Sequence, residues 1–395
     1  MSDGQLLYLI LWLIYLSDCF QWIRFGTVML VNPWSRQWQV QRSVLTLQSH
    51  RGRLAMVNPF PPLGRFILPE ILPLSISPRG IASVSMQTLE RGISPVKTAN
   101  ILGFEEIISL EFKDSWLVIN ESRFCRFADP GVGRQVIELL ERIKALPEDQ
   151  REEPIREFWA NRLDIEKLDH ELTGAWQEIA DLQILSNLLF VITFVAAPVA
   201  AQFFGASPLI VPVAILMFLM AYIITGAFFR CHRKLFPDNR WDRWEQAFKM
   251  VMCPPMAIRS ADLLMRLVGR SHDAMAVISL VMKHSRGKQL LQRIIRDLHH
   301  PMSPAVDDDR LETIGQWQNQ VILDVASEKI PEFADLIPEA LETPEKQADE
   351  CKLYCPRCRT QFVVERDTCP DCVGVMLKPL MADIDSDKIH DGCAR

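Results

Sequence analysis

The longest uncharged stretch of the chain runs over residues 182-229, between Asp181 and Arg230. A bilayer core requires about 20 apolar residues per helix, so this stretch is too long for one membrane span and fits two. Gly205-Ala206-Ser207-Pro208 provides turn residues near its middle. The pattern therefore predicts a transmembrane hairpin, with helices over 182-204 and 209-229.

A shorter apolar stretch covers residues 5-23. It contains Asp18 and Gln21, so it only just reaches the length of one membrane span. We predict a transmembrane helix here, with a helix lying in the membrane interface as the alternative. A cleaved signal peptide fits less well, because no Lys or Arg precedes the apolar residues and no small-residue cleavage site follows them.

Basic residues flank the hairpin on both sides and are absent from its turn. Such residues near the ends of membrane spans mark the cytoplasmic side. We therefore expect an integral protein of the inner (cytoplasmic) cell membrane, with the N-terminus outside and the soluble domains and C-terminus in the cytoplasm. The flanking basic residues are Arg162, Lys167, Arg230, Arg233, Lys234, Arg240, Arg243 and Lys249.

Residues 25-147 predict a mostly-β domain closed by a helix. Its last strands, Ile107-Phe112, Trp116-Ile119 and Arg123-Phe127, are separated by tight polar turns, which predict a meander. Apolar residues then recur at helical spacing over 132-143, which predicts the closing helix. This order resembles the pleckstrin-homology plan, and a generic small β domain is the alternative.

Helical patterns lie on both sides of the hairpin. Residues 153-181 carry an apolar face that continues into the first hairpin helix, which predicts a helical stalk. Residues 235-329 predict a cytoplasmic helical bundle, because short polar connections join successive helices. One apolar face within it suits either an anionic membrane surface or the core of the bundle. That face comprises Trp241, Trp244, Phe248, Val251 and Met252.

Two C-P-x-C motifs near the C-terminus carry the clearest chemistry, Cys355-Pro356-Arg357-Cys358 and Cys369-Pro370-Asp371-Cys372. Paired cysteines at this spacing can place four thiolates tetrahedrally around one zinc ion. The pattern resembles the small zinc-ribbon module of many bacterial and archaeal proteins, over about Leu353-Pro379 only. A redox dithiol or disulfide pair is the alternative. The resemblance implies a structural Zn²⁺ with the ligands Cys355, Cys358, Cys369 and Cys372.

The chain departs from the usual ribbon where a glycine commonly follows each motif. Arg359 and Val373 occupy these positions, and Gly374 is shifted by one. Glycine eases a turn with positive φ, so we expect a weaker turn geometry with all four ligands retained. Cys351 and Cys393 are expected to be free thiols in solvated ends.

Composition excludes some classes of partner. The net charge of −6 and the pI of about 5.8 provide no basic field, so we expect no nucleic-acid partner. Ten cysteines in 395 residues, four of them at metal-ligand spacing, favour a reducing compartment over a disulfide scaffold. The hairpin has no ionisable residue and therefore no carrier for an ion or proton pathway.

Two weaker patterns have simpler interpretations. His299-His300 with Asp307-Asp308-Asp309 could bind a divalent cation, but a polar loop between helices accounts for them better. Gly131-Val132-Gly133 could hold an anion, but a lone G-x-G is more typical of a simple helix start.

The fold class predicted is therefore an α+β membrane protein. We expect a membrane-anchored cytoplasmic scaffold or interaction protein, with the lipid bilayer and cytoplasmic proteins as partners, rather than an enzyme. The alternatives are a membrane-bound enzyme whose site is not visible from one sequence, and an accessory subunit of a transporter or secretion complex. The predicted segments are a transmembrane helix (5-23), a mostly-β domain with closing helix (25-147), a helical stalk (153-181), two transmembrane helices (182-204 and 209-229), a helical bundle (235-329), a linker (330-350), a zinc ribbon (351-380) and a disordered tail (381-395).

Overall fold

The computed structural model describes most of the chain and divides it into two compact units. One unit combines Met1–Ile71 with Asn161–Lys288, and the other combines Leu72–Ala160 with Gln289–Arg395. The described residues are 3–23, 28–32, 37–40, 46–49, 52–56, 64–67, 72–87, 96–113, 116–127, 130–205, 207–237, 239–268, 272–280, 285–301, 309–364, 366–372 and 374–380. The predicted tail over 381-395 lies outside them.

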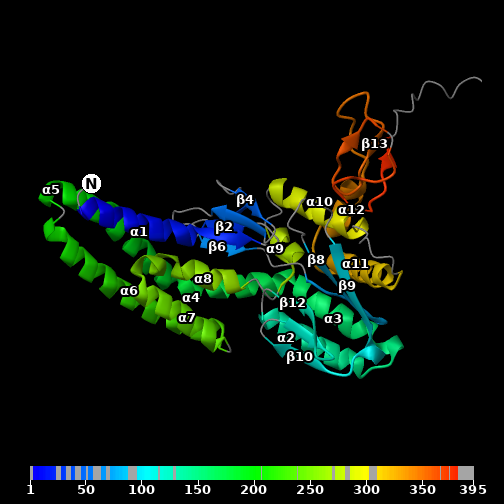
Figure 1. The fold of residues 1–395 in the computed structure, drawn as a ribbon, viewed down its shortest axis with the longest axis horizontal. Coiled ribbons are helices and arrows are strands. Elements are labelled where there is room, and N and C mark those ends of the chain that lie inside the picture. Colours follow the sequence, from blue (N-terminus) through cyan, green and yellow to red (C-terminus); the bar gives the residue numbers. More distant parts are fainter. Residues whose placement is uncertain are drawn as a thin grey trace, which may run out of the picture. The chain divides into compact units, whose positions relative to one another are not determined.

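A helical hairpin forms the centre of the first unit (Figure 1). Its turn contains Gly205 at φ +81°, in the left-handed region that favours glycine. Two stretches, Ile165–Phe204 and Val211–Leu235, are long and apolar enough to cross a membrane. The helices are α4 (Ile165–Val191), a π-helical turn η3 (Ile192–Ala196), α5 (Ala197–Phe204) and α6 (Ser207–Leu235).

The predicted stalk over 153-181 consists of two helices. The chain breaks at Asp164, between α3 (Glu152–Leu163) and α4. The Asp164 carboxylate caps α4 by accepting a hydrogen bond from the Lys167 backbone N–H at 2.9 Å. Only α4 therefore continues into the hairpin, and it buries the predicted face through Leu168, Leu172 and Ile179.

Helix α1 (Asp3–Cys19) packs antiparallel to α4. The Tyr8 hydroxyl donates to the Phe194 carbonyl at 3.2 Å, and one turn later the Trp12 ring lies 4.3 Å from the Phe194 ring at a tilt of 45°. Tyr15 then meets Phe190 at 5.7 Å, closer to the start of α4. The start of α1 therefore lies toward the hairpin turn (Figure 1). With 17 residues, α1 is about 25 Å long, slightly short of a bilayer core of about 30 Å.

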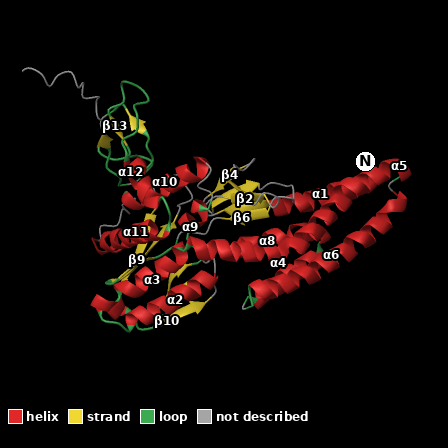
Figure 2. Ribbon diagram, turned by 180° about the vertical axis from the view of Figure 1, so that it is seen from behind, coloured by secondary structure: helices red, strands yellow, loops and turns green. Residues whose placement is uncertain are grey.

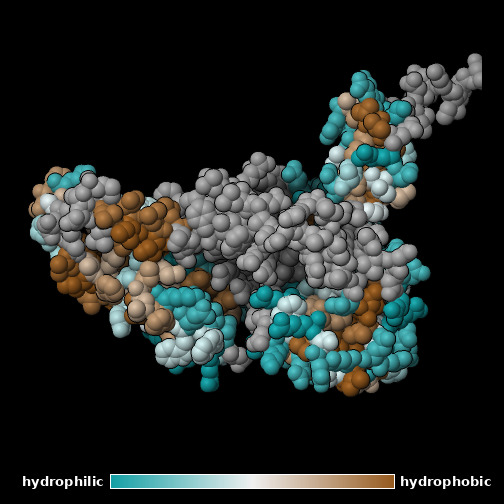
Figure 3. All heavy atoms as spheres, viewed as in Figure 1, coloured by the Kyte–Doolittle hydropathy of each residue, from teal (hydrophilic) through white to brown (hydrophobic). Residues whose placement is uncertain are grey.

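The outer surfaces of α1 and of the hairpin over residues 182-229 are largely apolar. Figure 3 shows hydrophobic residues gathered over α1 and α6. The large apolar side chains exposed on these helices include Leu9, Leu13, Ile184, Leu188, Val191, Val195, Val199, Phe203, Val211, Ile215, Phe218, Leu219 and Ile223.

Short helices that follow the hairpin pack back onto it. The Ser260 hydroxyl lies 2.9 Å from the Ser186 hydroxyl of α4, and the Trp244 ring lies 4.8 Å from the Phe229 ring of α6. The hairpin thus covers one face of these helices, and the predicted bundle over 235-329 is divided between the two units near Lys288. The helices in the first unit are α7 (Arg240–Met252), η4 (Pro254–Arg259), α8 (Ser260–Val268) and α9 (Ala274–Ser279).

The described strands of the first unit form small antiparallel sheets with the orders β1-β5-β4 and β3-β2-β6. Strand β1 follows α1 directly. The strands are β1 (Phe20–Ile23), β2 (Val28–Asn32), β3 (Gln37–Val40), β4 (Thr46–Ser49), β5 (Gly52–Met56) and β6 (Gly64–Ile67). The predicted mostly-β domain over 25-147 is therefore shared between the two units.

The second unit contains the predicted meander and its closing helix (Figure 2). Strands β10, β11 and β12 pair antiparallel in order, and Asn120 and Glu121 form the tight turn with positive φ. Helix α2 packs against β10, and the pleckstrin-homology plan itself stays a prediction. The elements are η1 (Phe104–Glu106), β10 (Leu110–Lys113), β11 (Trp116–Ile119), β12 (Ser122–Arg126), α2 (Pro130–Lys144) and η2 (Glu148–Gln150).

A further sheet of the second unit, in the order β7-β8-β9, is covered by α11 (Asp309–Lys329). The Gln318 side-chain oxygen accepts a hydrogen bond from the Ile76 N–H at 2.6 Å. Ala82 packs against Leu311 and Ile314 of the same helix. The strands are β7 (Ser75–Ser77), β8 (Gly80–Gln87) and β9 (Val96–Gly103).

A helix lies within the predicted linker over 330-350. Helix α12 (Phe333–Leu341) buries Phe333, Leu336 and Ala340. These residues recur at helical spacing and form an apolar stripe that a solvated linker would leave exposed. The segment is therefore structured because of the contacts that the stripe makes.

Candidate metal centre

Four cysteine side chains meet at the C-terminal end of the second unit. The Sγ atoms of Cys355, Cys358, Cys369 and Cys372 all lie within 4.8 Å of one another, and the side chains of all but Cys358 are buried. A tetrahedral zinc ion with bonds of about 2.3 Å requires sulfur atoms about 3.8 Å apart. Cys358 Sγ and Cys369 Sγ are 3.8 Å apart, so the cluster is compatible with a zinc site.

Short strands hold the two C-P-x-C motifs in place. Strands β13 (Leu353–Tyr354), β14 (Gln361–Phe362) and β15 (Lys378–Pro379) form a sheet in the order β14-β13-β15. The first motif follows β13, and the second follows Thr368, which bridges to Met376. The motifs thus leave neighbouring extended segments and turn toward one another.

Each motif closes with a turn that needs a positive φ. Arg359 N–H donates to the Cys355 carbonyl at 2.9 Å, and Arg359 itself has φ +62°. In the second motif, Val375 N–H donates to the Cys372 carbonyl at 3.0 Å, and Gly374 has φ +76°. The first turn thus forms without glycine, while the shifted glycine supplies the positive φ in the second.

The Arg359 side chain explains how an arginine is tolerated in this turn. Its Nη2 donates to the carbonyls of Glu339, Ala340 and Glu342 at 3.1 to 3.2 Å, at the C-terminal end of α12. A left-handed residue costs about 1 to 2 kcal/mol. Hydrogen bonds from a charged donor contribute about 1.5 to 3 kcal/mol each when well formed. The contacts to α12 therefore offset the strain.

Arg357, within the first motif, fixes the cluster to helix α10 (Ser285–His299). Its Nε lies 3.0 Å from an Asp297 carboxylate oxygen, and its Nη1 donates to the His300 carbonyl at 3.0 Å. Arg296 Nε donates in turn to the Arg357 carbonyl at 3.2 Å. The first motif is thus held by α10 through Arg357 and by α12 through Arg359.

The thiols have unequal acidity. Burial raises the pKa of Cys355 to about 11 and also raises the pKa of Cys372. Burial opposes ionisation of Cys358 as well, but hydrogen bonds with Thr360, Cys355 and Cys369 together outweigh it and lower the pKa of Cys358 to about 7. Metal binding requires all four thiolates and would release the remaining protons.

Cys351 was expected to be a solvated thiol, but the structure buries its side chain. Its side chain is buried against Tyr354 and Leu380, because β13 and β15 close over it. Cys393 lies outside the described residues.

The structure describes parts of the two weaker sequence patterns, the histidine and aspartate group near residue 300 and the G-x-G at residue 131. His299 ends α10, and His300 follows it. Burial lowers the pKa of His300 to about 4, and Asp307 and Asp308 lie outside the described residues. Gly131-Val132-Gly133 lies in the first turn of α2. A Cβ atom on Gly133 would lie 2.3 Å from the Phe112 ring, so this glycine permits close packing of α2 on β10.

An ion pair buried against the hairpin was not foreseen. Arg259 Nη1 lies 2.8 Å from the Asp262 carboxylate, and both side chains are buried. Arg259 also stacks over the Tyr15 ring at 5.5 Å, near the contact between Ser186 and Ser260. An R-x-x-D spacing is common on solvated helices, so the sequence offered no signal for this location.

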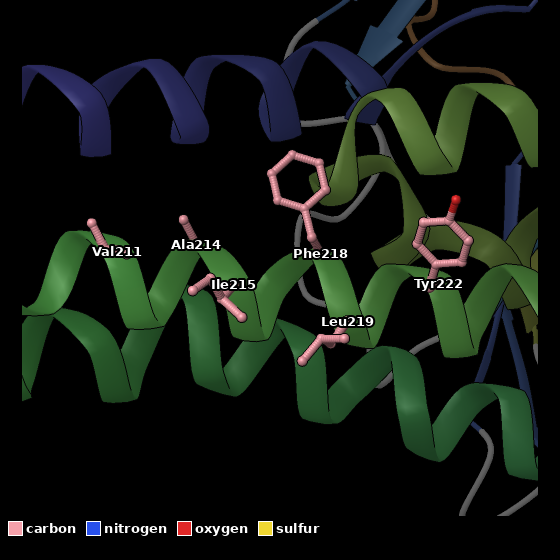
Figure 4. A pocket seen from close by; sticks show the side chains of 6 residues that line it. All are labelled: Val211, Ala214, Ile215, Phe218, Leu219 and Tyr222. Carbon is pink, nitrogen blue, oxygen red and sulfur yellow. The ribbon is translucent and has the colours of Figure 1, made fainter.

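The outer face of α6 carries a shallow groove (Figure 4). Its lining side chains are apolar apart from the Tyr222 hydroxyl: Val211, Ala214, Ile215, Phe218, Leu219 and Tyr222. This groove has no catalytic groups.

No protein-family model, no curated protein and no solved structure matches this chain. The arguments about function therefore depend on the geometry described above.

Proposed function

We propose that the chain is a membrane-anchored scaffold or interaction protein, with its soluble parts in the cytoplasm and a structural zinc ribbon near its C-terminus. The observation that carries this proposal is the helical hairpin. It joins two helices of spanning length through Gly205, has no charged residue over 182-229, and presents large apolar side chains outward. Such a surface is stable in lipid and costly in water.

The direction of α1 supports the proposed topology. Its start lies toward the hairpin turn, through the contacts of Tyr8 with Phe194 and of Tyr15 with Phe190. The basic residues that flank the hairpin lie at the opposite end of α4 and α6. Both features favour an N-terminus and a hairpin turn outside the cell, with the remaining parts inside.

The cysteine cluster supports a structural role for zinc. Four thiolate ligands leave no open position for a substrate or water, so the metal would contribute to folding rather than to catalysis. Four thiolates around Zn²⁺ carry a net charge of about −2. Arg357 within the first motif and Arg359 directly after it would offset this charge while joining the ribbon to α10 and α12.

Three experiments test the proposal, the first on the full chain purified in detergent and the others on native membranes. Metal analysis should find one zinc per chain, which Cys355→Ser removes and Cys351→Ser leaves in place, since Cys351 lies outside the cluster. A zinc-free wild-type chain would contradict the ribbon assignment. Cross-linking in native membranes, followed by mass analysis, should identify cytoplasmic partners attached to the soluble parts. A chain released from membranes by alkaline carbonate would contradict the anchoring.

A further inference from the structure

We propose that helix α7 lies on the anionic inner leaflet of the membrane and binds its headgroups and upper acyl chains. The inference rests on the proposed membrane placement of the hairpin and adds a second, lipid-selective contact to it.

Helix α7 presents an uncovered apolar stripe. Trp241, Trp244, Phe248 and Met252 are 83%, 62%, 66% and 66% exposed. They recur at intervals of three and four residues, so they share one face of the helix. The opposite face is buried through Ala247 and Met250. The sequence left two interpretations open for this stripe, the core of the helical bundle or an anionic membrane surface. Within the described part of this unit, the stripe does not pack into a core.

The stripe continues the apolar outer surface of the hairpin. Phe218, Tyr222 and Phe229 follow one another along α6 at helical spacing, and the Phe229 ring meets the Trp244 ring edge-on at 4.8 Å. The Arg243 guanidinium lies over the Phe229 ring, 5.0 Å from its centroid. A lipid surface that contacts α6 would therefore reach α7 without a break.

The charges around α7 favour anionic lipid as the occupant. Residues 230-252 contain Arg230, Arg233, Lys234, Arg240, Arg243 and Lys249 against Asp238, Asp242 and Glu245, a net charge of +3 in a chain of net charge −6. Arg230, Arg233 and Arg240 are exposed. Helices with Trp and Phe on one face and basic residues beside it bind the boundary between headgroups and acyl chains.

Photo-crosslinking of the full chain tests this inference. A benzophenone amino acid replaces Phe248, and the protein is reconstituted in vesicles of phosphatidylcholine alone or mixed with phosphatidylglycerol. Leu219 on α6 is the membrane control, because its side chain is 58% exposed within the predicted span. Glu111, exposed on β10, is the cytoplasmic control.

We expect lipid adducts at positions 219 and 248, none at 111, and more adduct at 248 in the anionic vesicles. The double variant R233Q/R240Q should reduce the anionic-to-neutral adduct ratio at 248, because each basic residue near an anionic surface contributes a factor of about five in binding. Arg134→Gln, an exposed basic residue of α2, should leave the ratio unchanged.

The outcomes separate this inference from the proposed function. Adducts at 219 without adducts at 248 would overturn the placement of α7 and leave the anchored hairpin intact. Protein dimers cross-linked through 248 would overturn it in favour of a second copy of the chain. Absence of lipid adducts at both positions would overturn the membrane anchoring itself.

Discussion

Arg359 shows how one side chain can compensate for a residue type that its backbone disfavours. The residue has φ +62° in the turn after Cys358, where glycine is the usual choice. Its guanidinium donates to three carbonyls at the end of α12, carbonyls that have no partner within the helix itself. The strained turn and the helix end therefore stabilise each other.

The contacts of Arg359 predict different effects for two substitutions. Arg359→Ala should destabilise the ribbon by about 1 to 2 kcal/mol, since it loses the carbonyl contacts and keeps the left-handed strain. Arg359→Gly loses the same contacts but relieves about 1 kcal/mol of strain, so it should be the milder change. Hydrogen exchange of the amides in β13, β14 and α12 measures both effects. Lys346→Ala, at an exposed position, is the control, and equal losses for all three variants would contradict the account.

Glycine substitutions provide a second test at the residue scale. Gly133→Ala should increase hydrogen exchange in α2 and cost about 1 to 3 kcal/mol, because its Cβ would meet Phe112 at 2.3 Å. Gly174→Ala in α4 meets nothing within 4 Å and should stabilise its helix by about 0.5 to 1 kcal/mol. A stabilising effect of Gly133→Ala would show that helix propensity, and not the contact with Phe112, controls this position.

The sequence predicts single residues well where type and spacing decide the outcome. The four cysteines of the C-P-x-C motifs meet because two short turns and a small sheet determine their positions locally. The burial of Cys351 and the contacts of Arg357 and Arg359 depend on α10, α12 and β15, which no local pattern relates to the motifs. The sequence alone therefore does not predict this burial or these contacts.

At the scale of elements, local patterns again predict what forms within a segment, whereas contacts between distant segments are not predicted. The meander over β10 to β12 and the hairpin turn at Gly205 follow from alternation, turn residues and helix length. The division of the predicted bundle and the presence of α12 in the predicted linker depend on which apolar faces meet. Periodicity identifies an apolar face but does not identify its partner.

The ion pair between Arg259 and Asp262 allows a test of how α8 is held against the hairpin. Asp262→Asn leaves a buried guanidinium without its carboxylate and should destabilise the chain by about 3 to 5 kcal/mol. The double variant R259M/D262L removes both charges and should lose much less stability. Thermal unfolding in detergent compares them. A lower stability of R259M/D262L than of Asp262→Asn would contradict this account, because the ion pair would then stabilise the fold more than apolar side chains in its place.

Removal of zinc should loosen the ribbon and the helices that hold it. Chelation should increase hydrogen exchange over β13 to β15 and at the end of α12, since a closed four-cysteine site contributes folding energy. Helix α2, in the same unit but without contacts to the ribbon among those described, should keep its protection and serves as the internal control. Unchanged exchange in the ribbon after complete loss of zinc would contradict the structural role.

At the scale of the whole molecule, the hairpin and the ribbon have complementary roles in the proposed account. The hairpin would fix the chain in the membrane, and the proposed ribbon would complete the C-terminal part of the second unit through its contacts with α10 and α12. Residues 182-229 of the hairpin contain no Asp, Glu, Lys, Arg or His, so in this account the chemistry available to partners would lie on the rest of the chain. The function is therefore expected to reside in surfaces presented to the cytoplasm.

Cys125 is a poor native reporter of this topology. Burial raises the pKa of Cys125 to about 12, and its thiol would resist modification on either side of a membrane. Introduced cysteines at exposed positions avoid this difficulty. Gln202 near the hairpin turn, Glu111 on β10 and Lys346 after α12 are exposed.

The most direct test of the account is labelling of these variants in intact cells with a membrane-impermeant maleimide. Gln202→Cys should be labelled in intact cells, whereas Glu111→Cys and Lys346→Cys should be labelled only after the cells are opened. The wild-type chain should give no label in intact cells. Labelling of Glu111→Cys or Lys346→Cys from outside, with Gln202→Cys protected, would contradict the cytoplasmic placement on which the proposed function depends.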